Sequence, residues 1–180
     1  MKKTLSIGLV CLVALSIGAL VGCTKNEDKP ASGSNDTGAT YVDLGLTSGT
    51  KWKSANEKNT ADAEHDFYTF NEAIGKFKTS IPSKDQWTEL FNECQWTWTG
   101  DGYKVEGRNG NSITLPAAGS RECNGNIINV GTCGYFWTST MDTVYYNDGE
   151  HIWGVRILNG NKDTYCYKRC DGHSIRLVQK

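Results

Sequence analysis

The chain has 180 residues, and its 19 lysine and arginine residues nearly balance its 20 aspartate and glutamate residues, so the formal net charge is −1. This balance, without a block of basic residues, argues against a nucleic-acid partner. The 20 glycines, 6 tryptophans and 8 tyrosines, against only 2 methionines, favour short strands and structured loops over a helical bundle.

The N-terminal residues have the composition of a secretory signal peptide. Two lysines near the start are followed by an uncharged, mostly apolar run over residues 5–21. The run ends in Leu-Val-Gly-Cys at residues 20–23, which resembles the lipobox of bacterial lipoprotein signals. The resemblance implies that residues 1–22 are removed and that Cys23 is acylated, which anchors the protein to a membrane. A retained span is the alternative, since the apolar run is close to the lower limit of about 17 residues for a transmembrane helix.

Residues 23–40 are expected to form a lipidated, disordered tether that leads to a single-domain body at residues 41–180. The tether is rich in Gly, Ser, Asn, Asp and Lys and has no large apolar residue with which to bury a face. Lys-Asn-Glu-Asp at residues 25–28 resembles the charged segment that exports lipoproteins to the cell surface in Bacteroidetes-type bacteria. A plain solvated linker is the alternative. The predicted location is the outer membrane, at the cell surface, with a periplasm-facing position left open.

The first part of the body is expected to contain a strand and two helices. Residues 41–46 alternate like a strand and lead into a turn. Apolar residues repeat at spacings of three and four over residues 67–77, which predicts a helix with one buried face. Ser83 is the predicted N-cap of a second helix, with Gln86 completing a capping box, and this helix is expected to end near residues 93–95.

The second part of the body changes to an alternating pattern, which predicts antiparallel strands and an α+β class. A Gly/Asn-rich loop is expected over residues 119–134. Four tryptophans are expected to face inward by helical or strand period, namely Trp87, Trp96, Trp98 and Trp137. The expected strands cover residues 96–99, 103–105, 112–116, 135–140, 151–158, 164–168 and 174–178.

The strand at residues 151–158 has two different faces. One face carries His151, Trp153, Val155 and Ile157, and the last three make it the more apolar, so this face is expected to point toward the core. The opposite face, expected to point outward, carries Ile152, Gly154, Arg156 and Leu158.

Five blocks spread along the body carry a resemblance to a known family. They read YVDLGLTSGTKW at 41–52, IPSKDQWTELFNECQWTWTGDGYKVEG at 81–107, NGNSITLPAAGSR at 109–121, GYFWTST at 134–140 and RCDGHSIRLVQ at 169–179. In this order and spacing they resemble the Fibrobacter succinogenes major paralogous domain. The resemblance implies a C-type-lectin-like fold, in which two helices pack on a small antiparallel sheet and long loops carry ligands.

The resemblance also implies a recognition function. Similar proteins of gut bacteria vary the segment between the last two blocks, in some cases through diversity-generating retroelements, and here that segment is residues 141–173. It implies that the C-terminal hairpin and loops bind a glycan, a protein or another cell-surface ligand. Rigid aromatic side chains beside arginine suit such a surface. The candidate ligand-binding residues are Arg156, Leu158, Tyr165, Tyr167, Asp171 and His173.

Two alternatives stay open for this segment. One is an ordinary solvent-facing hairpin stabilised by cross-strand aromatic pairs. The other is a structural envelope lipoprotein whose hairpin face packs against a partner subunit.

The chain has seven cysteines, of which one leaves with the signal and one is lipidated, so five remain. Export permits disulfides, and five cysteines can form two bridges in about fifteen ways. The resemblance favours Cys123–Cys170, because both lie beside turns in family blocks and the lectin-like fold brings the late loop beside the last strands. Pairing of Cys166 with Cys170, or of Cys123 with Cys133, is the alternative. Cys94 is expected to be a small buried residue on its helix.

No metal, cofactor or catalytic centre is predicted. Tyr-Asn-Asp at residues 146–148 resembles a Trp-Asn-Asp calcium motif, but its Glu-Pro-Asn or Gln-Pro-Asp partner is missing, so residues 147–149 are expected to form a turn. The three histidines are scattered, and phosphate-loop, GxSxG and HExxH motifs are absent from the sequence. Formylglycine-generating enzymes share the fold and use a pair of cysteines. Cys166 and Cys170 are therefore the enzyme alternative, on fold analogy alone.

Overall fold

The computed structural model describes residues 40–180, so the expected signal peptide, the lipidation site Cys23 and nearly all of the tether lie outside the described residues. The described chain contains two α-helices, two short 3-10 helices and eleven strands. All strand ladders are antiparallel, and most strands follow the helices in the chain. The predicted α+β class is therefore confirmed. Between residues 40 and 180, no helix has the length and apolar character needed to cross a membrane.

The two α-helices begin at capping boxes that the local sequence specifies. In α2 (Lys84–Glu93), the Ser83 hydroxyl accepts from the Gln86 N–H, and the Gln86 side chain accepts from the Ser83 N–H. The predicted cap and the predicted end of this helix are confirmed. In α1 (Phe70–Phe77), Thr69 and Glu72 form the same box. The helix therefore starts three residues later than predicted, after Thr69.

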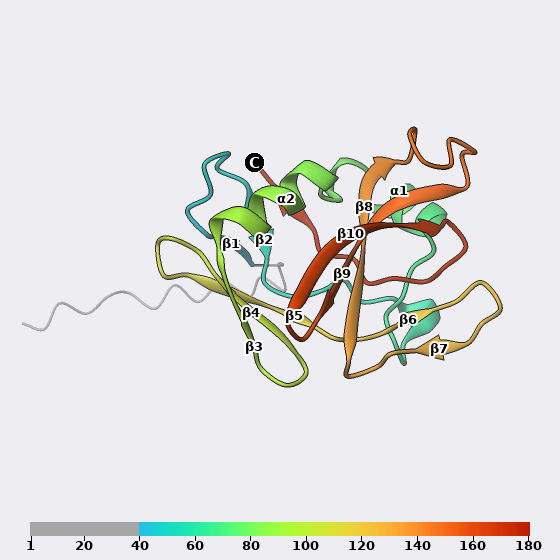
Figure 1. The fold of residues 1–180 in the computed structure, drawn as a ribbon, viewed down its shortest axis with the longest axis horizontal. Coiled ribbons are helices and arrows are strands. Elements are labelled where there is room, and N and C mark those ends of the chain that lie inside the picture. The colour runs from blue at the N-terminus through green and yellow to red at the C-terminus, as the bar shows by residue number, and fades with distance from the viewer. Residues whose placement is uncertain (1–39) are drawn as a thin grey trace, which may run out of the picture. The chain divides into compact units, whose positions relative to one another are not determined.

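The strands form four small sheets (Figure 1). One joins β1 (Tyr41–Asp43), β2 (Lys51–Lys53) and β11 (Val178–Gln179). A second joins β3 (Gln95–Trp98), β4 (Gly102–Glu106) and β5 (Ser112–Pro116). The central sheet joins β8 (Cys133–Met141), β9 (His151–Leu158) and β10 (Asn161–Lys168). A hairpin of β6 (Ser120–Arg121) and β7 (Ile127–Ile128) occupies the predicted loop. The 3-10 helices are η1 (Thr60–Asp62) and η2 (Lys78–Ser80).

The last predicted strand, residues 174–178, is only partly regular. Just β11 forms a ladder, while Ser174 makes an isolated bridge to Phe136. The backbone of this segment bonds to several neighbours in turn: Ser174 bonds to β8, the Ile175 carbonyl accepts from the Glu57 N–H, and the Leu177 carbonyl accepts from the Lys53 N–H. The buried Arg176 guanidinium adds donations to the carbonyl oxygens of Lys53 and Thr114 and to the Asn56 side chain. Bonds to several segments thus replace the continuous ladder that was expected.

The central sheet has a hydrophobic cluster on each face. Phe136, Val155 and Ile157 face one cluster, where α2 contributes Trp87 and Leu90. Trp137 and Ile152 belong to the other cluster, where α1 contributes Phe70 and Ala73. The two clusters explain why alternation along β9 could not show which side chains are buried.

Two expectations about side-chain burial need correction. Ile152 was expected outside but is fully buried, because the second cluster covers that end of its face. Trp87 and Trp137 are fully buried as expected. Trp96 and Trp98 are only half-buried, because β3 is the border strand of its sheet and they pack at the rim of the first cluster.

Candidate functional site

The face of the central sheet that points away from α2 carries most of the polar side chains of interest. In register, Arg156 on β9 lies between Tyr135 on β8 and Asp163 on β10. Directly opposed residues of neighbouring strands share a face. Tyr165 and Tyr167 lie on this face as well, because they follow Asp163 at steps of two.

This face forms one wall of a cleft of about 690 Å³. The volume lies within the range of roughly 300–1,000 Å³ usual for small-molecule sites. The opposite wall comes from the β6–β7 hairpin and from the loop after β10. The lining residues are Ser120, Glu122, Cys123, Asn124, Ile128, Tyr135, His151, Arg156, Tyr165, Cys166, Tyr167, Lys168, Asp171 and His173.

Five of the six candidate ligand-binding residues come together in this cleft, namely Arg156, Tyr165, Tyr167, Asp171 and His173. Leu158 does not line it. That residue lies at the far end of β9, opposite Cys133 and Asn161. His173 was expected to be on the surface but is only 1% exposed, so it belongs to the floor of the cleft.

Aromatic rings surround His173 on several sides. Its ring centroid lies 4.2 Å from that of Trp137, 4.7 Å from that of Tyr167 and 5.5 Å from that of Tyr135. Burial lowers the pKa of His173 from its usual value to about 3, so the imidazole is neutral at physiological pH. Because the only acceptor near Nδ1 is the Gly172 carbonyl, 3.0 Å away, Nδ1 carries the proton. Nε2 is then a hydrogen-bond acceptor, and it has no partner among the described residues.

Tyr167 presents a second polar atom of the same kind. Its hydroxyl is buried and has no hydrogen-bond partner in the described part of the chain. Burial raises the pKa of Tyr167, so the phenol stays protonated and can both donate and accept. Gly154 makes room for the ring, because a Cβ at that position would lie 2.7 Å from Tyr167 Cδ2. The glycine in the middle of β9 thus helps to place the tyrosine over the sheet.

Arg156 is fixed by a two-point ion pair. Its Nη2 lies 2.7 Å from Asp163 Oδ2, and its Nε lies 3.2 Å from Asp163 Oδ1. These hydrogen bonds raise the pKa of Arg156 above its usual value. A bidentate pair holds the guanidinium in one orientation, so Arg156 is a positioned, half-exposed group of the cleft wall.

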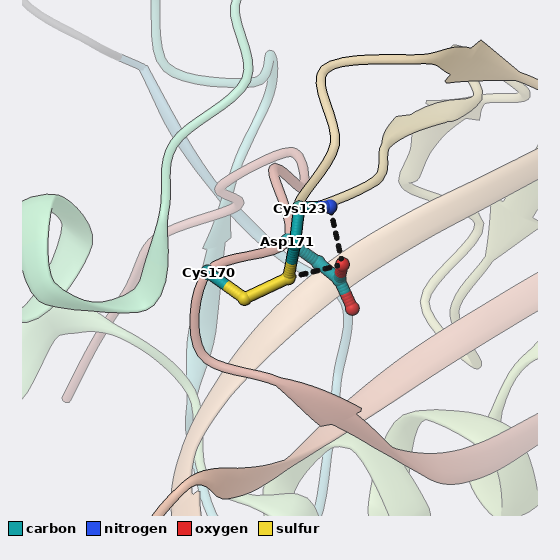
Figure 2. Close-up of side chains that lie close together, drawn as sticks. All are labelled: Cys123, Cys170 and Asp171. Atoms are coloured by element: carbon teal, nitrogen blue, oxygen red, sulfur yellow. Dashed lines mark hydrogen bonds between the residues drawn. A yellow bond between two sulfur atoms is a disulfide. The ribbon is translucent and has the colours of Figure 1, made fainter.

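Cys123 and Cys170 form a disulfide that joins the β6–β7 hairpin to the loop after β10, the two segments of the wall opposite the sheet, as the resemblance implied. Their Cα atoms are 5.1 Å apart, and 47 positions separate them in sequence. Figure 2 shows Asp171 beside this bridge: the Cys123 N–H donates to Asp171 Oδ1 at 3.1 Å, and Cys123 Sγ lies 3.2 Å from the same oxygen. Burial raises the pKa of Asp171. The bridge therefore also positions a carboxyl group at the cleft.

The chemistry of this corner does not suit a metal. Cys123, Cys170 and Asp171 are the one group of three such side chains close enough together among residues 40–180, and both sulfurs are already bonded to each other. A disulfide sulfur is not the thiolate that a metal needs. The alternative Cys166–Cys170 pair is not formed either, since Cys166 is free.

Several cleft residues were not identified from the sequence. Tyr135 was assigned only to a strand, and its position beside Arg156 depends on the register of β8 and β9. The Tyr135 hydroxyl accepts from Asn129 Nδ2 at 2.7 Å. Glu122 and Asn124 belong to the Gly/Asn-rich loop, whose composition was the available signal. His151 was placed on the core side of its strand, yet it lines the cleft and its Nδ1 lies 2.7 Å from Asp148 Oδ2.

Comparisons of the chain with protein-family models, with curated proteins and with solved structures found no match.

Proposed function

We propose that this chain is an exported lipoprotein whose C-terminal cleft binds a hydroxyl-rich ligand, namely a glycan of a cell surface. The proposal combines the signal and lipobox-like sequence at residues 1–23 with the cleft. It also adopts the C-type-lectin-like fold implied by the resemblance to the Fibrobacter succinogenes major paralogous domain. The two helices and the small antiparallel sheets of the described residues are consistent with that fold.

One observation carries the ligand class. Five buried side-chain polar atoms have no partner among residues 40–180, and two of them, His173 Nε2 and the Tyr167 hydroxyl, belong to residues that line the cleft. A buried polar atom without a partner costs roughly 1–3 kcal/mol. A ligand or a bridging water that supplies the missing hydrogen bonds recovers this free energy.

The charges of the cleft favour a neutral ligand over an ionic one. His173 Nε2 accepts a hydrogen bond, so a ligand with acceptors only, such as a phosphate or carboxylate, leaves it unsatisfied. The basic Arg156 and Lys168 and the acidic Glu122 and Asp171 all line the cleft, and Arg156 is paired with Asp163, so neither sign of charge dominates the walls. Sugar hydroxyls both donate and accept, and the ring of the half-exposed Tyr165 offers an apolar face against which a sugar can lie.

Screening of the full-length protein on an array of glycans, followed by titration of the best binder, tests the proposal. Replacing Tyr167 with Phe removes only the hydroxyl without a partner. Because one hydrogen bond contributes on the order of 1 kcal/mol, we expect glycan affinity to fall about 5- to 10-fold. The matched control is Tyr145→Phe, which removes an exposed hydroxyl outside the cleft and should leave affinity unchanged. Equal affinity of Tyr167→Phe and the parent protein would contradict the proposed site.

The location is tested separately by labelling cells with radioactive palmitate. The parent protein should incorporate label and fractionate with the outer membrane, because acylation of Cys23 supplies the anchor. Cys23→Ala should remain unlabelled. Label retained on Cys23→Ala would exclude lipidation at this position, whatever the cleft binds.

A further inference from the structure

Strand β10 is the border of the central sheet, and its outer side is unpaired. All eight residues of β10 lie opposite β9, and the sheet order is β10-β9-β8 (Figure 1). From residue 161 to 167, no backbone hydrogen bond joins β10 to any described segment other than β9. The outward N–H and C=O groups of such a border are a template for another strand.

An aromatic slot of about 360 Å³ lies along this border, on the sheet face opposite the cleft. Trp153 on β9 and Cys166 on β10 are directly opposed and form its base. Tyr145 and Tyr146 from the β8–β9 loop form a wall. Thr164 and Tyr165 complete the slot on β10 itself. The cleft and the slot therefore lie on either side of one strand border.

The loop that carries the slot tyrosines is held in place. The buried Asp142 carboxylate accepts from the N–H groups of Val144, Tyr145 and Tyr146 at 2.7–3.1 Å. Burial alone would raise the pKa of Asp142, but these hydrogen bonds lower it below its usual value. The tyrosines are thus presented by a fixed turn, which limits the entropy lost on binding.

Exposed apolar side chains gather around this slot. Among residues 40–180, seven large hydrophobic side chains are exposed, and five of them lie on the end of β8, the β8–β9 loop and β10. Contiguous apolar surface on a soluble domain is typical of an interaction site. The five residues are Met141, Val144, Tyr145, Tyr146 and Tyr165.

Two lysines bracket the slot on the same face of β10. Alternation places Lys162 and Lys168 on the slot side of β10, with Thr164 and Cys166 between them, and Lys168, at the end of the strand, also borders the cleft. Neither lysine forms an ion pair with a described residue. A partner that follows the border therefore meets positive charge, then an aromatic slot, then positive charge.

We propose that β10 binds an extended polypeptide segment of another protein by strand addition. The segment places an apolar or aromatic side chain in the slot and acidic side chains beside Lys162 and Lys168. The row of free backbone groups selects a polypeptide, because neither a lipid nor a sugar matches the spacing of a strand. This site lies on the other side of β10 from the glycan cleft, with which it shares Tyr165 and Cys166, and it fits a lipoprotein that joins a surface assembly.

Selection from a displayed library of random ten-residue peptides on the full-length protein, purified in mild detergent, tests the proposal. Selected peptides should carry an apolar residue flanked at alternate positions by Asp or Glu. Methylating backbone nitrogens on one edge of the best peptide should abolish its binding, while methylation on the other edge should not. Selection of no motif, or indifference to methylation on both edges, would overturn strand addition.

Variants of the protein locate the binding site. Tyr145→Ala removes one wall of the slot and should weaken binding of the selected peptide about 10-fold or more, whereas the exposed Val130→Ala on the distant β7–β8 loop should not.

The charge reversal Lys162→Glu with Lys168→Glu should shift selection toward Lys- or Arg-flanked peptides. Its control, Lys51→Glu with Lys180→Glu, changes net charge equally and should retain the acidic motif. An unchanged motif in the β10 variant argues against the proposal.

Two further measurements separate this site from other possibilities. Tyr167→Phe should bind the peptide as the parent does, so failure of the glycan cleft and failure of the strand site are distinguishable. Sedimentation compares the self-association of the full-length parent protein with that of Tyr145→Ala, and we expect no difference. If the parent self-associates and Tyr145→Ala does not, the border pairs with a second copy of this chain and the proposed partner is wrong.

Discussion

The two faces of the central sheet are built from the same three strands but have opposite chemistry. Toward α2, the sheet presents Phe136, Val155 and Ile157, all fully buried among apolar neighbours. Toward the cleft, the same strands present Tyr135 and Arg156 together with further polar groups. Around Phe136, Val155 and Ile157 the chain itself fills the α2 face, whereas around Tyr135 and Arg156 the other face leaves a volume open beside polar side chains.

Two tyrosine hydroxyls make the difference concrete. Tyr103 belongs to the α2-side cluster, and its hydroxyl donates to the Leu158 carbonyl and accepts from the Gly160 N–H, both at 3.0 Å. The Tyr167 hydroxyl on the cleft face has no partner in the described residues. Native chains satisfy nearly all buried polar groups, and Trp87 Nε1 in the α2-side cluster is another exception among the described residues. What distinguishes Tyr167 is that it lines an open volume, whereas Trp87 is enclosed by apolar neighbours.

The largest test of this comparison is Phe136→Ala. The ring is fully buried and lies 5.3 Å from that of Trp87, so its loss should lower the free energy of unfolding by about 3–5 kcal/mol. Tyr165→Ala on the other face is the control, because that side chain is 55% exposed and should cost less than about 1 kcal/mol. Urea unfolding measures both. Similar losses for the two variants would remove the distinction between the faces.

The next effect concerns pH and His173. Its pKa is lowered to about 3 in the folded chain, against about 6.5 when unfolded. The unfolded state binds the proton more tightly than the folded state does. The contribution of the neutral His173 to the free energy of unfolding is therefore complete above pH 6.5 and is lost as the pH falls toward 3. At pH 5 the loss is about 2 kcal/mol.

Urea unfolding of the parent protein and of His173→Asn at pH 7 and pH 5 measures this contribution. The asparagine can still donate to the Gly172 carbonyl but does not titrate in this range. The parent should lose about 2 kcal/mol more than the variant between the two pH values. Equal losses would mean that the imidazole is not buried in neutral form.

The smallest effect compares the two hydroxyls. Tyr103→Phe should lower the free energy of unfolding by about 1–2 kcal/mol, because it leaves a backbone carbonyl and N–H without their partner. Tyr167→Phe should leave stability unchanged or raise it slightly, since it removes a group that is unsatisfied in the described chain. Thermal unfolding of both variants measures the difference. A clear loss for Tyr167→Phe would show that its hydroxyl already has a partner in the free protein.

Local sequence patterns predicted the regular elements well where their cause is local. The capping box of α2 and the strands at residues 112–116 and 151–158 match the structure. Helix caps and strand alternation depend on neighbours within a few residues. The start of α1 was predicted three residues too early, because the capping box formed by Thr69 and Glu72 was not part of the prediction.

The site was less accessible to such reasoning because it depends on contacts between distant segments. Alternation placed Arg156 on the correct side of β9, but it placed Ile152 in solvent, since it could not show that α1 covers that end of the face. His173 was expected on the surface for the same reason, as its burial depends on Tyr135 and Trp137 from β8. In both cases, segments that are distant in the sequence determine the burial of the side chain.

The disulfide between Cys123 and Cys170 has a consequence for where the cleft can work. A link across 47 positions removes about 4 kcal/mol of chain entropy from the unfolded state, yet it lies outside both hydrophobic clusters. Without the bridge the clusters can still form, but the β6–β7 hairpin is then held to the loop after β10 mainly by the pair of backbone hydrogen bonds between Arg121 and Gly172. Oxidation of the two cysteines adds a covalent link within this wall, and such links persist in oxidising surroundings. The covalent link therefore makes one wall of the cleft depend on the redox state of its surroundings.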